Sequence, residues 1–87
     1  MFTVKVKRKI ARDLAQLPPA VQNRFRALVV DLEQSGARQT DWANFSALGN
    51  NRYPCHLTYR YVACWTFTKG TIDIEVYYVG SRESAPY

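Results

Sequence analysis

The stretch YVACWTFTKGTIDIEVYYVGS, residues 61–81, contains two alternating runs on either side of Lys69-Gly70. In the first run, Tyr61–Thr68, both sets of alternating positions contain apolar side chains, which is typical of a strand in the centre of a sheet. In the second run, Ile72–Val79, Asp73 and Glu75 alternate with apolar residues. Because a short turn containing glycine separates the two runs, the stretch predicts an antiparallel hairpin.

A third strand is expected just upstream, over Tyr53–Thr58. If Tyr59-Arg60 is the tip of a symmetric hairpin, Cys55 lies opposite Cys64 in the next strand. A register shift of one residue would separate the two cysteines. Either way, we expect both to be thiols, because two cysteines are too few for a disulfide framework and the chain reads as cytosolic.

The N-terminal half predicts one short strand and a helical hairpin. Phe2–Lys7 alternates apolar and polar residues, and from Arg8 the apolar period lengthens to that of a helix until Pro18-Pro19 interrupts it. A second helix is expected from Pro19, with a stop at Ser35-Gly36. Its apolar stripe consists of Val21, Phe25, Leu28, Val29 and Leu32.

Residues 37–51 have no sustained period, but Trp42, Phe45 and Leu48 predict a packed loop. The expected fold is therefore α+β, a single domain over residues 1–87. It consists of an N-terminal strand, a helical hairpin and a three-stranded antiparallel meander, which form one mainly antiparallel sheet with two helices on one face.

The chain is basic, with 12 Lys and Arg against 7 Asp and Glu and a formal charge of +5. An 87-residue domain has a modest core, so function is expected on an open surface and not in a deep cavity. The charge favours a polyanionic partner such as nucleic acid, although an acidic protein segment or an ordinary solvated face fits it too. Five cations fall within the first twelve residues: Lys5, Lys7, Arg8, Lys9 and Arg12.

No apolar run is long enough to span a bilayer, and no secretory leader is recognised, so a cytoplasmic location is expected. Zinc-ligand spacing and the glycine-rich phosphate-binding motifs are also absent from the sequence. We therefore expect neither a metal nor a cofactor.

Three residues of the C-terminal half could together cleave RNA. Such cleavage needs a base for the 2′-hydroxyl, a cation for the charged transition state and an acid for the 5′-oxygen. His56 is the only histidine, and its strand alternation predicts a side chain on the face away from the core. Arg82 follows the last strand, and Tyr87 ends the chain. Each also has an ordinary alternative: a structural histidine, a surface ion pair of Arg82 with Glu83, and a frayed tail.

The segments YPCHLTYRYVACWTF (53–67), IDIEVYYVGSRE (72–83) and APY (85–87), together with the order β-α-α-β-β-β, resemble the RelE/ParE superfamily of toxins. The likeness is greatest to small RelE-like cytotoxic translational repressors of type II toxin-antitoxin systems. It implies an mRNA interferase that cleaves messenger RNA at the ribosome without a metal. It also implies a cognate antitoxin as partner, with a heterotetramer as one form of the complex.

The resemblance assigns His56, Arg82 and Tyr87 to the catalytic surface, while Arg52, Arg60, Lys5 and Lys7 are the expected RNA-binding cations. Two positions depart from the family pattern. Pro54 occupies a position where a second-strand lysine is common, and Val62 replaces the third-strand arginine. Two alternatives therefore stay open: a ParE-like inhibitor of DNA gyrase, and a non-toxic member that keeps antitoxin binding.

Overall fold

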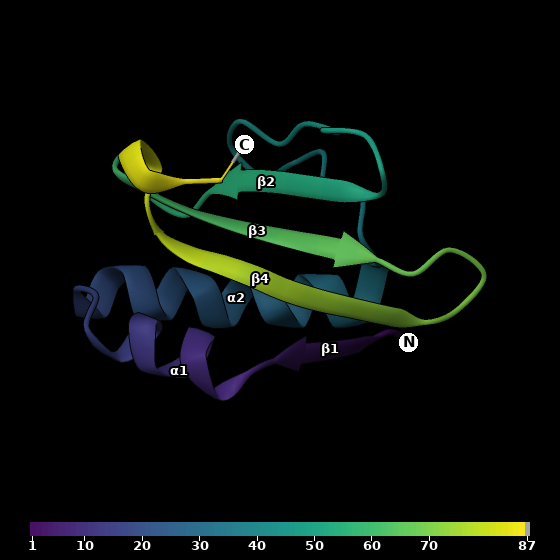
Figure 1. Ribbon diagram of the computed structural model, residues 1–87, viewed down its shortest axis with the longest axis horizontal. Helices are drawn as coiled ribbons and strands as arrows, with labels where there is room; N and C mark the ends of the chain where they lie inside the picture. Colours follow the sequence, from purple (N-terminus) through teal and green to yellow (C-terminus); the bar gives the residue numbers. More distant parts are fainter. Residues whose placement is uncertain (87) are drawn as a thin grey trace.

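The computed structural model describes residues 1–86, and its elements follow the predicted order (Figure 1). They are β1 (Thr3–Val6), α1 (Arg8–Ala15), α2 (Pro19–Ser35), β2 (Arg52–His56), β3 (Tyr61–Phe67), β4 (Asp73–Ser81) and the short 3-10 helix η1 (Arg82–Ser84). For most of the helices and strands, the observed first and last residues differ from the predicted ones by one or two positions. No helix within residues 1–86 is long and apolar enough to cross a membrane.

The four strands form one sheet in the order β1-β4-β3-β2. β1 runs parallel to β4, whereas β4, β3 and β2 are antiparallel neighbours. Both helices lie on the same face of this sheet (Figure 1). The predicted α+β architecture is confirmed, and the expectation of a central β3 is confirmed with it.

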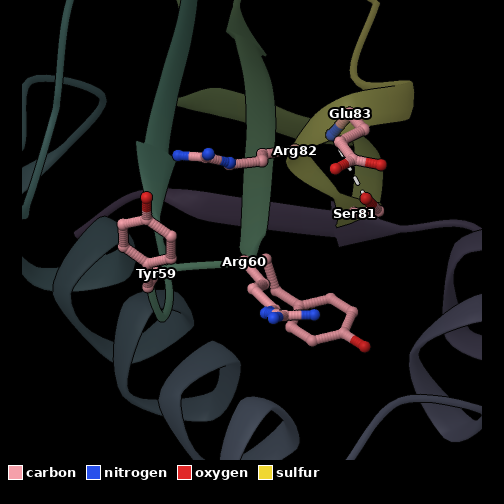
Figure 2. Close-up of a pocket in the computed structure, with 6 residues that line it drawn as sticks. Tyr59, Arg60, Ser81, Arg82 and Glu83 are labelled. Atoms are coloured by element: carbon pink, nitrogen blue, oxygen red, sulfur yellow. Dashed lines mark hydrogen bonds between the residues drawn. The ribbon is translucent and has the colours of Figure 1, made fainter.

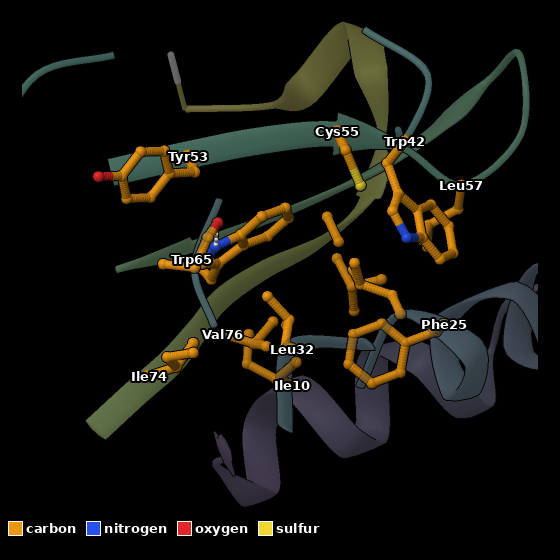
Figure 3. Packing of buried hydrophobic residues seen from close by; sticks show 14 of the residues in the cluster. Ile10, Phe25, Leu32, Trp42, Tyr53, Cys55, Leu57, Trp65, Ile74 and Val76 are labelled. Carbon is orange, nitrogen blue, oxygen red and sulfur yellow. Dashed lines mark hydrogen bonds between the residues drawn. The ribbon is translucent and has the colours of Figure 1, made fainter. Parts of the chain in front are cut away.

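The core lies between the helices and one face of the sheet, and Trp65 on β3 is its largest fully buried side chain (Figure 3). Its indole Nε1 donates a hydrogen bond of 2.9 Å to the carbonyl of Ala37. Its rings also stack against Phe45, with centroids 6.1 Å apart, and against Tyr53 at 6.4 Å. The segment between α2 and β2 is therefore a packed loop, as predicted, because a central tryptophan holds it on the core.

The predicted register of the β2–β3 hairpin is wrong by one residue. Cys55 lies opposite Ala63, and Cys64 lies opposite Pro54. The cause is the length of the turn: the N–H of Leu57 donates to the carbonyl of Tyr61 over 2.8 Å, which leaves three residues at the tip instead of two.

Both cysteines are free and fully buried. Burial raises the pKa of the Cys55 thiol to about 12 and that of Cys64 to about 11, so both are protonated at neutral pH. Buried, protonated thiols are poor nucleophiles. The structure therefore gives the two cysteines a packing role.

Tyr77 and Tyr78 are neighbours in β4, so simple alternation along the strand would put them on opposite faces of the sheet. Instead, Trp65 pairs with Val76 and Cys64 pairs with Tyr78, which leaves Tyr77 as the extra residue of a β-bulge. The bulge keeps Val76 and Val79 in the core and leaves both tyrosines out of it. Both rings are therefore placed on the open face of the sheet, the face away from the helices.

Gly36 ends α2 in a conformation that only glycine adopts readily, with φ 91° and ψ −167°. A Cβ at this position would also lie 2.8 Å from Cζ of Phe2. We expect Gly36→Ala to lower the free energy of unfolding by roughly 1–3 kcal/mol, as measured by urea denaturation. Gly49→Ala is the matched control, because Gly49 has φ 88° but open space around it. Equal losses of stability in the two variants would rule out the contact with Phe2 as a cause.

Candidate nucleic-acid interface

The β2–β3 turn and the end of β4 enclose a cavity of about 250 Å³ (Figure 2). Such a volume is below the roughly 300–1,000 Å³ of drug-sized ligand sites and suits a single base or phosphate group. The lining contains three phenolic or hydroxyl side chains, two guanidinium groups and one carboxylate. Its residues are Tyr59, Arg60, Tyr61, Ser81, Arg82 and Glu83.

Arg82 is held at this cavity by contacts with the β2–β3 turn. Its backbone N–H donates to the carbonyl of Arg60 over 2.9 Å. Its guanidinium carbon lies 4.5 Å from the centre of the Tyr59 ring, in a cation–π arrangement. The expected alternative, an ion pair with Glu83, does not form within residues 1–86. Because stacking uses the face of the guanidinium, its N–H edges stay available for an anion.

The turn that carries Tyr59 is anchored to α2. Nε of Arg24 donates to the carbonyl of Leu57 over 3.3 Å, and the same guanidinium lies 4.4 Å from the Trp42 ring centre. The Trp42 indole in turn donates to Oδ2 of Asp31 over 2.8 Å. This chain of contacts fixes the turn from the helical side, while Tyr59 itself stays 73% exposed.

His56 ends β2 and is half-buried. It pairs with Val62, which pairs with Gly80, so the three residues form one row across β2, β3 and β4. Strand spacing puts the Cα of His56 about 10 Å from that of Gly80, two residues before Arg82. Both candidate residues are thus at the same end of the sheet. The imidazole is not among the side chains that line the cavity in residues 1–86.

Asn44 from the packed loop is the side chain beside this imidazole. Its amide nitrogen lies 3.4 Å from Nε2 of His56, and it donates when Nε2 is the unprotonated nitrogen. The same loop binds the strand directly, because the backbone N–H of His56 donates to the carbonyl of Ala43 over 2.8 Å. The loop therefore fixes the position of the strand. When Nε2 accepts from Asn44, Nδ1 carries the ring proton, so Nε2 is the nitrogen that can accept a proton once it is released from Asn44.

Gly80 brings the end of β4 close to Tyr78. A Cβ at Gly80 would lie 2.8 Å from the Tyr78 hydroxyl, so the phenol occupies the space that a side chain would need. That hydroxyl donates to the carbonyl of Ser81 over 2.7 Å. Ser81 caps η1, since its Oγ accepts from the N–H of Glu83 over 3.1 Å. These contacts set the direction in which Arg82 leaves the sheet.

The remaining predicted cations lie elsewhere on the sheet. Arg52 begins β2, four residues before His56, and its Nε is buried without a hydrogen-bond partner among residues 1–86. Lys5 is on β1, at the opposite edge of the sheet, where its backbone lies opposite that of Glu75 on β4. Lys7 makes an ion pair of 3.2 Å with Glu75. Of the four predicted RNA-binding cations, only Arg60 lines the cavity with Arg82 in the described part of the chain.

Tyr87, the third predicted catalytic residue, lies outside the described residues. Among residues 1–86, no three His, Cys, Asp or Glu side chains are grouped so that they could hold a metal ion. Several polar side chains of the site were not predicted, and Tyr61 and Ser81 are among them. Glu83 was considered only as an ion-pair partner, and Asn44 belongs to a loop whose sequence has no period that would reveal its contacts.

No known family model and no curated protein matches the sequence. Solved structures do match the fold. RelE of the archaeal RelE-RelB complex from Pyrococcus horikoshii superimposes with a TM-score of 0.76 at 18% identity, over 97% of this chain and 98% of that one. The isolated E. coli RelE toxin gives 0.74 at 14% identity, over 99% and 89%.

A third similar structure is a heterotetrameric YoeB-YefM toxin-antitoxin complex from Staphylococcus aureus. It gives a TM-score of 0.65 at 11% identity, over 87% of this chain and 91% of that one. Two of these three structures are thus complexes of a toxin with its antitoxin. At these identities the likeness is one of fold, and it extends over nearly the whole chain. The protein has the fold of the RelE and YoeB toxins.

Proposed function

We propose that this protein is the toxin of a type II toxin-antitoxin system and that it inhibits translation by cleaving messenger RNA at the ribosome. The observation that carries the proposal is the cavity at the end of the sheet, where Arg82 is stacked on Tyr59 beside Arg60. Two guanidinium groups that line a cavity of single-base size suit the phosphate and base of an unpaired RNA strand. The near full-length likeness to RelE supports this function.

In the proposed reaction, His56 removes the proton from the 2′-hydroxyl, and the 2′-oxygen then attacks the neighbouring phosphorus. Arg82 stabilises the negative charge that develops on the phosphate oxygens. Tyr87 stacks on a base or donates the proton that the departing 5′-oxygen needs. The ribosome positions the messenger, which suits a small domain with an open site.

We assign Arg60 to the RNA near the scissile bond, and Arg52, Lys5 and Lys7 to weaker contacts with the backbone of RNA farther away. Lys7 is already paired with Glu75, but exposed ion pairs are weak and exchange readily with phosphate. A cognate antitoxin would cover the basic cavity and could assemble with the toxin in a heterotetramer. Because the substrate is on ribosomes, the proposal places the protein in the cytoplasm.

One observation favours a second candidate, inhibition of DNA gyrase. The row between His56 and Gly80 is filled by Val62, which is fully buried and carries no charge. A gyrase inhibitor would not need a cation at this position, whereas an RNA-cleaving site would gain from one.

The experiment that tests the proposal is expression of the protein in a bacterial host, followed by primer-extension mapping of messenger RNA ends. Cuts in phase with codons, which disappear when initiation is blocked before induction, are the expected result. Plasmid supercoiling is measured in the same cultures. Intact messages together with relaxed plasmids would contradict the ribonuclease and favour the gyrase inhibitor, while normal growth and intact messages would favour a non-toxic member of the same fold.

A further inference from the structure

Glu83 is a carboxylate that lines the cavity and forms no ion pair there. Within residues 1–86 neither nearby arginine forms an ion pair with it, although Arg82 is its neighbour in sequence and Arg60 lines the same cavity. Figure 2 shows why: the side chains of Arg82 and Glu83 leave η1 in different directions, and the guanidinium extends toward Tyr59. A carboxylate is an acceptor only, so this one is available to N–H groups of a ligand.

The cavity combines three kinds of recognition within one small volume. Tyr59 and Tyr61 offer aromatic rings, Arg60 and Arg82 offer N–H donors, and Glu83 offers two acceptor oxygens. Unpaired RNA bases are bound by stacking on such rings and by hydrogen bonds to their edges. A site for an anion alone would gain nothing from the Glu83 carboxylate, because two negative charges repel each other. A base is therefore a better ligand for this set of side chains than a phosphate alone.

The base that fits best is guanine. Its Watson–Crick edge carries two adjacent donors, N1–H and the N2 amino group, which match the two oxygens of a carboxylate. In adenine and cytosine the amino group lies next to an acceptor nitrogen, and in uracil the single N–H lies between two carbonyl oxygens, so each of them presents an acceptor to the carboxylate. Guanine also offers O6 and N7, the pair that arginine binds.

We propose that the cavity binds a guanine base of the substrate RNA, with Glu83 on N1–H and N2, Arg60 on O6 or N7, and Arg82 left for the adjacent phosphate. The inference rests on the proposed function, because it names the base that the messenger presents beside the scissile bond. It makes Glu83 a specificity-determining residue and predicts cleavage next to guanine.

Binding of nucleotides to the purified protein tests the cavity without the ribosome. We expect GMP to bind about tenfold more tightly than AMP in a titration followed by amide chemical shifts. IMP, which keeps N1–H and O6 but lacks the N2 amino group, is expected to bind with intermediate affinity. Equal affinities for GMP, IMP and AMP would overturn the proposal.

Glu83→Gln keeps the size of the side chain but replaces one acceptor oxygen with a donor, so it should remove the preference for GMP. The matched control is Glu75→Gln, the same chemical change on β4 outside the cavity, which should keep the preference. A Glu83→Gln variant that still prefers GMP as the wild type does would show that Glu83 is not the selecting residue.

Mapping of cleavage sites separates this inference from the proposed function. Wild-type cuts should be enriched next to guanine, and Glu83→Gln should spread them over other bases. Codon-phased cuts without any preference for guanine would refute the guanine site but would still support the proposed ribonuclease activity. Selective binding of GMP by a protein that makes no cuts would support the cavity and refute the ribonuclease.

Discussion

Replacing Arg82 by alanine is expected to lower the rate of messenger cleavage by about 10²- to 10³-fold, the usual effect of removing one group that stabilises developing charge. The guanidinium is held over Tyr59 at 4.5 Å by its stacked face, and its backbone is bonded to the β2–β3 turn. Little reorganisation is then required when charge develops on the phosphate. The measurement is single-turnover cleavage of a messenger bound to purified ribosomes.

Two variants show whether the effect is electrostatic. Arg82→Lys keeps the charge but not the planar fork, so its rate should fall between those of the wild type and the alanine variant. Arg26→Ala removes an exposed arginine of α2 that bonds only to Asn23 over 2.9 Å within the described residues, and it should cleave like the wild type. Arg82→Ala also removes the cation–π interaction with Tyr59, which is worth only about 0.5–1 kcal/mol, so a large drop in melting temperature would point to misfolding instead.

The arrangement of the elements could be read from the sequence because two signals are strong in this chain. The apolar stripe of α2 places Val21, Phe25, Leu28 and Leu32 in the core, and all four are buried. Apolar residues on both faces of β3 indicate a central strand, which the sheet order confirms. Periodicity reports which residues are buried together, so it determines the layers of the fold.

Features that change the register of a strand by one residue could not be predicted from the periodicity of the sequence. The tip of the β2–β3 hairpin has three residues, and nothing in Thr58-Tyr59-Arg60 signals that length as Asn-Gly would signal a two-residue turn. The residues around Tyr77 likewise contain no sequence signal for the bulge. Both features are decided by packing over the whole sheet, where one inserted residue can exchange the faces of its neighbours.

The site was predictable as a region but not as a set of contacts. Arg60 and Arg82 come together because β3 begins where β4 ends, a consequence of antiparallel order that the sequence supports. By contrast, the stacking of Arg82 on Tyr59 and the separation of Glu83 from both arginines depend on side-chain directions in η1. A three-residue 3-10 helix has too few residues to show a period.

The predicted role of Lys5 and Lys7 in RNA binding shows a different limit of prediction from sequence. Their place among the first twelve residues suggested one basic cluster, but β1 is at the opposite edge of the sheet from His56. Charge density along the chain is therefore a poor guide to charge density on the surface when the strand order differs from the sequence order. Screening by salt weakens the attraction between exposed charges over such distances, so we expect these lysines to add little to the binding of a phosphate at the proposed site.

His56→Ala is expected to lower the same single-turnover rate by about 10²- to 10⁴-fold, because it removes the group proposed to accept the 2′-hydroxyl proton. The side chain is half-buried at the end of β2, and within residues 1–86 its polar contact is a long one of 3.4 Å with Asn44. Its removal should therefore cost little stability, and the melting temperature should change by only a few degrees. His56→Gln preserves polar contacts but cannot transfer the proton, so it should be as slow as the alanine variant.

Added imidazole distinguishes proton transfer from a structural role. The alanine variant opens space at the surface end of β2, and free imidazole that enters it should restore part of the rate in proportion to its concentration. The glutamine variant fills that space and should respond less. If Asn44→Ala also slows cleavage while imidazole still restores His56→Ala, Asn44 orients the ring and His56 carries the proton. A His56→Ala protein that cleaves at the wild-type rate would instead leave Arg82 without its proposed base, and the base would have to be a group of the ribosome or of the RNA.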